Sequence, residues 1–382
     1  MWKIAIKMLM GDRSKYFTLV SSLVVVSFLF LQQGSIFCGL IMRTARPVEV
    51  VGAPIWISDP QLRSVDESKP LLDTDLQRVR SVPGVKWAVP LLLQLVSAHL
   101  SDGNFQTVRL YGLDNDTFFG RPKMISGNGR LLTQDQAVII GRAESEKLNN
   151  PNPGQVFEMN DNQARVVGIA DVPRDFFSYP FVYASYDRAL QYAPQQRKQL
   201  NFVLAAPADG LPVSEVTRRI RAETGLAAYS EQEFRWLTMD YYLKNTGIPI
   251  SIGISLLMVF LVGMSIVGQT FYQFALQNER YFGALKAMGT SGATLTKMIL
   301  LQALLVGLVG YGAGAGLGGI FGLIAGGQDS KIAFATPWPM VAISFVAVIT
   351  ICLLSALISI RKVVKLEPAV DRKSTRLNSS HI

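Results

Sequence analysis

Four long runs without a charged side chain constrain this chain more than any other feature. They cover residues 17–42, 248–274, 298–325 and 337–360, and each run has 24 to 28 residues. A helix of about 20 apolar residues is long enough to cross the hydrocarbon core of a bilayer. The sequence therefore predicts an α-helical membrane protein with four transmembrane helices.

A cleaved signal peptide is the alternative interpretation of the first run, 17–42. The run is long for the apolar part of a signal peptide, and no small-x-small cleavage pattern follows it. The preceding segment, 1–16, mixes lysine and arginine with apolar side chains, as a helix in the cytoplasmic membrane interface does. We expect a first helix that is retained, preceded by an interfacial segment.

The segment between the first two runs, 43–247, has the composition of a folded domain in water. From 43 to 244 it contains 23 Lys and Arg and 23 Asp and Glu, so it is neutral. Strand-like runs such as AVIIG and ARVVGIA alternate with helix-like runs such as VSEVTRRIRAETG. The fold class predicted is thus four transmembrane helices plus an extracytoplasmic α+β domain inserted between helices 1 and 2.

Two shorter stretches of this domain give local predictions. Residues 47–60, PVEVVGAPIWISDP, predict strands that are broken at Gly-Ala-Pro. QLVSAHL and FQTVRLYGL flank Ser-Asp-Gly-Asn at 101–104, which predicts a β-hairpin.

The charges beside the apolar runs predict the orientation of the chain. Within residues 1–370, ten Lys and Arg lie before the first run, between the second and third, or after the fourth, whereas Lys331 alone lies between the third and fourth. Because cytoplasmic loops carry the excess of positive charge, we expect segments 275–297 and 361–370 in the cytoplasm and loop 326–336 outside. The net charge of +9 is explained by these flanks and does not indicate a nucleic-acid partner.

The residue types needed for catalysis or metal binding are scarce. Cys38 and Cys352 both lie in apolar runs, and His99 and His381 are the only histidines. The phosphate-binding pattern GxxxxGK[ST] does not occur. We therefore expect no catalytic residue, metal ligand or cofactor in this chain.

A short polar segment, 277–291 (QNERYFGALKAMGTS), separates the second and third runs. Asn278 is predicted to cap a helix with its side-chain oxygen, Glu279 and Lys286 suit the two ends of the helix dipole, and Gly289 suits a left-handed C-terminal residue.

The same short helix is predicted to have one apolar stripe, formed by Tyr281, Leu285 and Met288. A helix of about three turns is marginal by itself and needs a surface to lie on. The alternative is an ordinary solvated loop.

The third run carries glycine at every fourth position, which aligns these residues on one helix face. Such a face lets another helix approach closely. We expect a partner helix in this chain or in a second copy, the alternative being general small-residue packing within one bundle; the glycines are Gly310, Gly314, Gly318, Gly322 and Gly326.

The polar segment and the run after it resemble the cytoplasmic coupling loop and following helix of MacB/FtsX-type ABC transporter permeases. Glu279, Gly283, Lys286, Ala287 and Gly289 stand at the recurring positions of that loop. The chain departs from the family at 291–293, often a second basic cluster, and at 302, often an acid. The ATPase-coupling residues that the resemblance implies are Glu279, Arg280, Tyr281, Gly283, Leu285, Lys286, Met288 and Gly289.

The domain between the first two runs resembles the MacB-type periplasmic core domain in the order of its VPGV, GRLL and VVGIA segments. Its size is similar to that of the LolC/LolE and DevC-type exporters, and no nucleotide-binding domain is fused to it. The resemblance implies a separate ABC ATPase that binds ATP and Mg, and a second permease copy in a homodimer or a paralogous heterodimer. A periplasmic adaptor and an outer-membrane channel are further partners in this family.

The function implied is export: ATP hydrolysis moves the periplasmic domain, which expels a substrate from the periplasmic side of the bacterial inner membrane, with both termini cytoplasmic. Two alternatives are an FtsX-like regulator of a periplasmic hydrolase and a membrane receptor without an ATPase. The last residues, 371–382, are similar to the translation of a sequencing-library adapter, so we expect the natural sequence to differ there.

Overall fold

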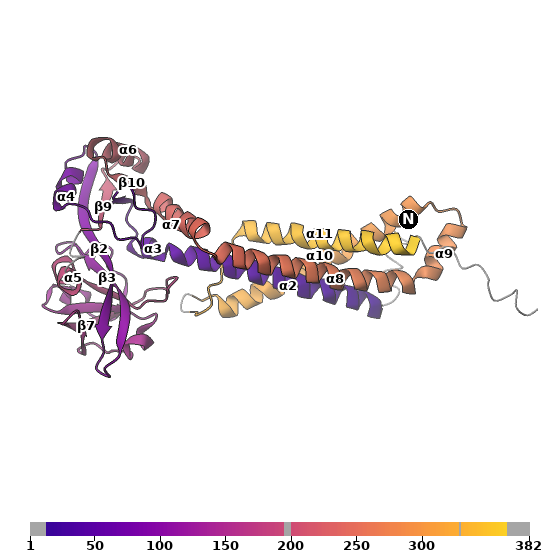
Figure 1. Cartoon of the computed structure of the whole chain (residues 1–382), viewed down its shortest axis with the longest axis horizontal. Coiled ribbons are helices and arrows are strands. Elements are labelled where there is room, and N and C mark those ends of the chain that lie inside the picture. Colours follow the sequence, from indigo (N-terminus) through magenta and orange to yellow (C-terminus); the bar gives the residue numbers. More distant parts are fainter. Residues whose placement is uncertain (1–12, 195–199, 328–329, 365–382) are drawn as a thin grey trace, which may run out of the picture. The chain divides into compact units, whose positions relative to one another are not determined.

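The computed structural model describes residues 13–194, 200–327 and 330–364, so the expected interfacial segment up to residue 12 and the suspected adapter sequence 371–382 lie outside the described residues. The chain divides into two compact units (Figure 1). The helical unit comprises Met1–Gly39, Pro249–Gly327 and Phe334–Ile382, and the sheet unit comprises Leu40–Ile248 and Gln328–Ala333.

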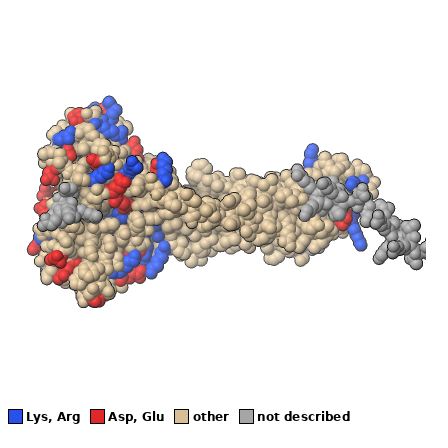
Figure 2. Space-filling view, viewed as in Figure 1, with Lys and Arg blue, Asp and Glu red and all other residues tan. Residues whose placement is uncertain are grey.

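The helical unit contains, within the described residues, four helices that are long and apolar enough to cross a membrane. They are α2 (Arg13–Thr44), α8 (Ile248–Gln277), α10 (Gly292–Ala325) and α11 (Trp338–Val364). Leu23, Phe271, Val306 and Cys352 lie in their common apolar core. This confirms the predicted fold class for the membrane part, and the visible face of the long helices carries almost no charged side chain (Figure 2).

Helix α10 begins six residues before its apolar run. The run was expected from residue 298, whereas α10 starts at Gly292 because the Ser291 side chain caps it by accepting a hydrogen bond from the Thr294 backbone N–H. The polar first turns therefore extend the helix beyond the hydrophobic stretch.

The sheet unit is built on one mixed sheet. Its strand order is β10-β1-β9-β2-β3-β8-β5-β7-β4, with β6 pairing β2 and β7. The β3–β8 and β5–β7 pairs are parallel. The strands are β1 (Ile55–Ser58), β2 (Val85–His99), β3 (Phe105–Leu113), β4 (Met124–Gly127), β5 (Ala137–Gly141), β6 (Val156–Met159), β7 (Asn162–Ala170), β8 (Phe181–Ser185), β9 (Phe202–Pro207) and β10 (Ala227–Ser230).

Helices cover both faces of this sheet, and the alternation of β2 shows why. Val89, Leu91 and Leu93 face the side of α3 (Arg46–Val51) and α7 (Glu231–Asn245). Ala88, Leu92 and Val96 face the side of α4 (Asp73–Arg80), α5 (Tyr186–Tyr192) and α6 (Val213–Thr224). The described part of the unit also contains two short 3-10 helices, η1 (Gly129–Thr133) and η2 (Ser145–Leu148). This mixture of strands and helices confirms the predicted α+β class.

The predicted hairpin is confirmed. Strands β2 and β3 pair antiparallel from Leu91↔Leu113 to His99↔Phe105, and Gly103 in the connecting turn has a positive φ of 84°. The strand prediction for 47–60 is wrong in its first half, because Arg46–Val51 is helix α3. Proline in its first turn and Gly52 in the left-handed conformation after its end favour the helix over the strand suggested by the valines.

Candidate functional site

The predicted coupling segment folds as helix α9 (Glu279–Ala287). Asn278 precedes it, but the prediction that its side-chain oxygen caps α9 is wrong. The side-chain Nδ2 instead donates to the Phe274 carbonyl at 2.8 Å. The Phe274 carbonyl also accepts the Asn278 backbone N–H at 3.2 Å, so both nitrogens of Asn278 bind the last turn of α8, and Asn278 is the only residue between α8 and α9.

The other end of α9 closes with a two-bond motif. Gly289 has a φ of 88°, as its position predicted. Its backbone N–H donates to the Lys286 carbonyl at 3.0 Å, and the Thr290 N–H donates to the Leu285 carbonyl at 3.1 Å. This is the hydrogen-bond pattern of the Schellman motif, so α9 has a defined end before α10 begins.

Helix α9 has one anchored face and one free face. Phe282 is buried against Leu295, Met298, Ile299 and Ile360 of the helical unit, and Leu285 packs on the same cluster. Phe282 was not identified as an anchor from the sequence. Its position three residues before Leu285, on the same side of the helix, was the signal that could have shown it. The predicted stripe of Tyr281, Leu285 and Met288 is therefore divided, because only Leu285 belongs to the anchored face.

The free face holds most of the predicted coupling residues. Tyr281 is 63% exposed and Met288 73% exposed. An added Cβ at Gly283 would have no neighbour within 4 Å, so the surface is open there. The other exposed members of the set are Glu279, Arg280, Lys286 and Gly289.

The glycine stripe of α10 lies largely against α2 of the same chain. An added Cβ would come within 2.6 Å of Leu23 Cβ at Gly310, within 2.6 Å of Ser27 Cβ at Gly314, and within 3.0 Å of a Leu31 methyl at Gly318. An added Cβ at Gly322 would instead meet the Phe334 ring, and one at Gly326 would meet the carbonyl oxygen of Gly322. The stripe thus lets two helices of one chain pack closely.

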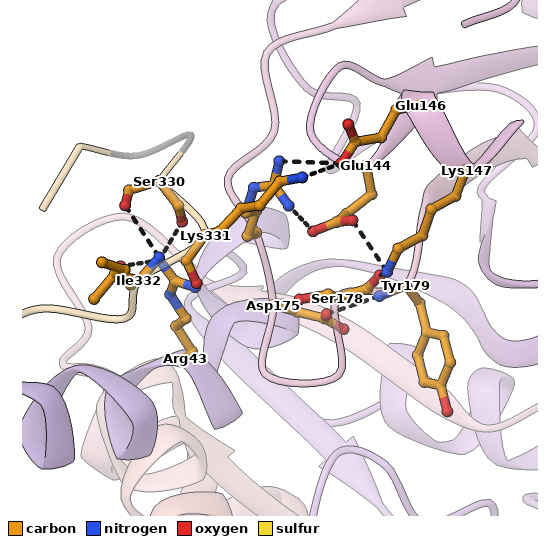
Figure 3. Close-up of polar contacts among 11 residues, drawn as sticks. Arg43, Glu144, Glu146, Lys147, Asp175, Ser178, Tyr179, Ser330, Lys331 and Ile332 are labelled. Carbon is orange, nitrogen blue, oxygen red and sulfur yellow. Dashed lines mark hydrogen bonds and ion pairs between the residues drawn. The ribbon is translucent and has the colours of Figure 1, made fainter. Parts of the chain in front are cut away.

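A second polar site lies in the sheet unit, where the loop between α10 and α11 meets the end of α2 (Figure 3). The Arg43 guanidinium donates to three successive carbonyls: to Ser330 at 2.8 Å, to Lys331 at 3.4 Å and to Ile332 at 2.9 Å. Arg43 is buried, with 9% of its surface exposed. The sequence indicated this loop only as a short outer connection.

An ionic network continues from this loop into η2 (Figure 3). Lys331 Nζ lies 2.9 Å from Glu146 Oε1, and Arg174 pairs with buried Glu144. Lys147 Nζ lies 3.0 Å from Glu144 Oε2. The hydrogen bond from Lys331, followed by its charge, holds the pKa of Glu146 below its ordinary value.

A third cluster is buried inside the sheet unit. Arg109 Nη1 lies 2.6 Å from Asp66 Oδ1, and Arg109 Nε lies 3.0 Å from Asp175 Oδ2. The Tyr242 hydroxyl donates to Asp66 at 2.7 Å, which ties α7 to this cluster. Burial alone would lower the pKa of Arg109, but the two carboxylates outweigh it and raise the pKa, so the guanidinium stays charged.

No group of three or more His, Cys, Asp and Glu side chains arranged to hold a metal ion occurs among the described residues. The described sites present hydrogen-bonded and ion-paired side chains and exposed apolar side chains.

Comparison with known proteins gives two matching family models. The model described as MacB-like periplasmic core domain matches residues 39–223, and the model described as FtsX-like permease C-terminal matches residues 253–368. Two uncharacterized ABC transporter permeases of Mycobacterium tuberculosis, from strains CDC 1551 / Oshkosh and ATCC 25618 / H37Rv, are 23% identical over 341 residues. The match covers 87% of this chain and 87% of each relative.

Solved structures of single domains are also similar. The periplasmic region of MacB from Actinobacillus actinomycetemcomitans has a TM-score of 0.37 and 17% identity, and the match covers 52% of this chain and 96% of that one. The extracellular domain of the noncanonic ABC-type transporter YknZ from Gram-positive bacteria has a TM-score of 0.34 and 14% identity, with 47% and 98% covered.

Proposed function

Because the chain belongs to the FtsX-like permeases of ABC transporters and carries a MacB-like periplasmic core domain, we propose that it transmits ATP hydrolysis from a separate ATPase subunit to this domain. The transmitted motion releases or extrudes a substrate from the periplasmic side of the bacterial inner membrane. ATP and Mg are bound by the ATPase subunit.

The observation that carries this proposal is the free face of α9. A helix of nine residues that is anchored by Phe282 but leaves Tyr281 and Met288 exposed has an apolar surface available for a partner. Short amphipathic helices commonly bind by inserting such side chains into a groove of another protein. A groove of the ATPase is the occupant that we propose for this face.

The orientation follows from the charges that flank the spans. The positive excess lies on the α9 side, and we propose that α9 and both termini are cytoplasmic and that the sheet unit is periplasmic. The four apolar runs contain no Asp, Glu, Lys or Arg, which supports mechanical transmission over an ion or proton pathway through the spans.

The working assembly that we propose contains a second permease copy, identical or paralogous, and two ATPase subunits. A periplasmic adaptor and an outer-membrane channel would complete the export route. Both extensions rest on the family and not on a feature of the described residues.

The experiment is ATPase stimulation in proteoliposomes that contain the chain and its cognate ATPase. Tyr281→Ala with Met288→Ala removes the two large exposed apolar side chains of α9 and of its C-cap residue, and we expect the stimulation to be lost. Buried interface anchors contribute about 2 kcal/mol or more each, so binding should weaken roughly thirtyfold for each residue.

Leu72→Ala is the matched control, because Leu72 is 70% exposed but belongs to the sheet unit. It should leave the stimulation unchanged. Stimulation at the wild-type level by the double α9 variant would refute the proposed docking.

A further inference from the structure

The loop between α10 and α11 is part of the sheet unit although the helices on both of its sides belong to the helical unit. Residues 328–333 group with the sheet unit, and the chain therefore passes from one unit to the other at four points instead of two. The points lie after residues 39, 248, 327 and 333. Something must hold so short a segment to the sheet unit.

Arg43 provides the strongest of these contacts. Its planar guanidinium donates to the carbonyls of Ser330, Lys331 and Ile332, so one side chain fixes three successive peptide groups. Hydrogen bonds from a charged donor are about twice as strong as neutral ones, and burial removes competing water. A lysine cannot reproduce this geometry, because its ammonium lacks the fixed fork of donors.

The neighbouring ion pair is weaker. The side chains of Lys331 and Glu146 are 72% and 50% exposed, and exposed ion pairs contribute little and are screened by salt. Arg43 also stands in the last turn of α2, where a basic residue often binds the carbonyls of its own helix. Its side-chain hydrogen bonds in the described structure go to the loop instead.

We propose that Arg43 is a positioning residue that makes the α10–α11 loop a part of the sheet unit, so that movement of α10 and α11 reaches this unit together with movement of α2 and α8. The inference deepens the proposed function and rests on it. If the chain joined the units only after residues 39 and 248, the sheet unit could rotate about the line between these two connections. The α10–α11 loop, bound by Arg43, is a third connection and removes this freedom. A tilt of the spans then becomes a defined movement of the sheet unit.

The first experiment needs no ATPase. Hydrogen exchange is measured by mass spectrometry on the full chain in nanodiscs, for the wild type, Arg43→Ala, Arg43→Lys, Lys331→Ala and Arg46→Ala. We expect exchange of the Ile332 amide, which donates to the Ser330 hydroxyl, to become roughly ten- to hundredfold faster in Arg43→Ala, because the bonds from a charged donor that hold this segment are lost. Arg43→Lys should lie between the wild type and Arg43→Ala, and Lys331→Ala should change little.

Arg46→Ala is the matched control. Arg46 lies three residues further along and pairs with Glu49, so its removal deletes the same charge without touching the loop. The amides of β2 and β9 report whether each variant is folded. If Arg43→Ala is not folded, Arg43→Lys tests the hydrogen bonds between Arg43 and the loop. Unchanged exchange of the Ile332 amide in a folded Arg43 variant would overturn the inference, whatever the ATPase does.

The second experiment adds the cognate ATPase and compares exchange in the sheet unit with and without nucleotide. We expect the nucleotide-dependent change to be lost in Arg43→Ala while stimulation of the ATPase through α9 persists. The same nucleotide-dependent change in Arg43→Ala and wild type overturns the positioning role alone. No nucleotide-dependent change in the wild type overturns the proposed function and the positioning role with it.

Discussion

Arg109 shows how single side chains organise the interior of the sheet unit. Its guanidinium is almost completely buried between Asp66, in the loop after β1, and Asp175, in the loop before β8. Tyr242 joins the same cluster from α7, the helix that precedes α8. The cluster therefore connects loops that are far apart in the sequence with the helix that leads into the second span.

We predict that Arg109→Met lowers the free energy of unfolding of the sheet unit by about 3–5 kcal/mol, because two carboxylates lose their buried partner. Tyr242→Phe should cost about 1.5–3 kcal/mol, since it removes one hydrogen bond to a charged group. Urea unfolding of the full chain in nanodiscs, followed through tryptophan fluorescence with buried Trp56 as the reporter in the sheet core and the other four tryptophans replaced by phenylalanine, measures both changes.

Lys86→Ala is the control for this prediction. Lys86 and Asp209 form an ion pair whose side chains are 51% and 87% exposed, so its loss should cost less than about 1 kcal/mol. Equal losses for Arg109→Met and Lys86→Ala would show that the buried cluster has no special role in stability.

The residues of these clusters could not have been chosen from the sequence. Arg43 meets residues 330–332, and Arg109 meets Asp66 and Asp175, through tertiary contacts for which no local pattern exists. Phe282 is different, because its helical spacing from Leu285 was visible. The prediction grouped Leu285 with Tyr281 and Met288 and left Phe282 out. The spacing of apolar residues cannot tell which of two apolar stripes on a short helix is buried.

Elements were predicted best where one physical effect dominates. The four uncharged runs and the β2–β3 hairpin follow from hydrophobicity and turn chemistry, and both are found in the structure. Arg46–Val51 was predicted as strand because β-branched valines favour strands. The structure has a helix there, which proline in its first turn and left-handed Gly52 after its end favour. End signals outweigh propensity in so short a segment.

Helix α10 allows a test of close helix packing at the scale of one element. A Cβ at Gly314 would lie 2.6 Å from Ser27 Cβ and 2.7 Å from the Val24 carbonyl oxygen, whereas a Cβ at Gly316 would meet nothing within 4 Å. We predict that Gly314→Ala destabilises the helical unit by about 1–3 kcal/mol through overpacking against α2. Titration with a denaturing detergent, followed by circular dichroism, measures this change.

Gly316→Ala provides the matched comparison in the same helix. It should stabilise the unit by up to about 1 kcal/mol, because alanine is the better helix former and no neighbour is displaced. Opposite signs for the two variants are expected, and the same sign would contradict the assignment of Gly314 to the contact with α2.

At the scale of the whole molecule, the helical unit and the sheet unit are each built from segments that alternate along the chain. The sheet unit interrupts the helical unit twice, once as the large insertion between α2 and α8 and once as the short loop between α10 and α11. The first insertion was visible in the sequence as a neutral block between apolar runs. The second was not, because a segment of a few residues carries no compositional signal and is assigned only by its contacts.

The orientation of the molecule is the last prediction. Ala284 of α9 is exposed and does not belong to the proposed coupling set, and Ser101 lies in the exposed turn between β2 and β3. With Cys38 and Cys352 replaced by alanine, a membrane-impermeant maleimide added to spheroplasts should label Ser101→Cys at once. Ala284→Cys should react only after permeabilisation, because the positive excess holds its side of the membrane in the cytoplasm. Labelling of Ala284→Cys in intact spheroplasts would place α9 outside the cell, where no ATP-driven subunit could reach it, and docking to a cytoplasmic ATPase would then be impossible.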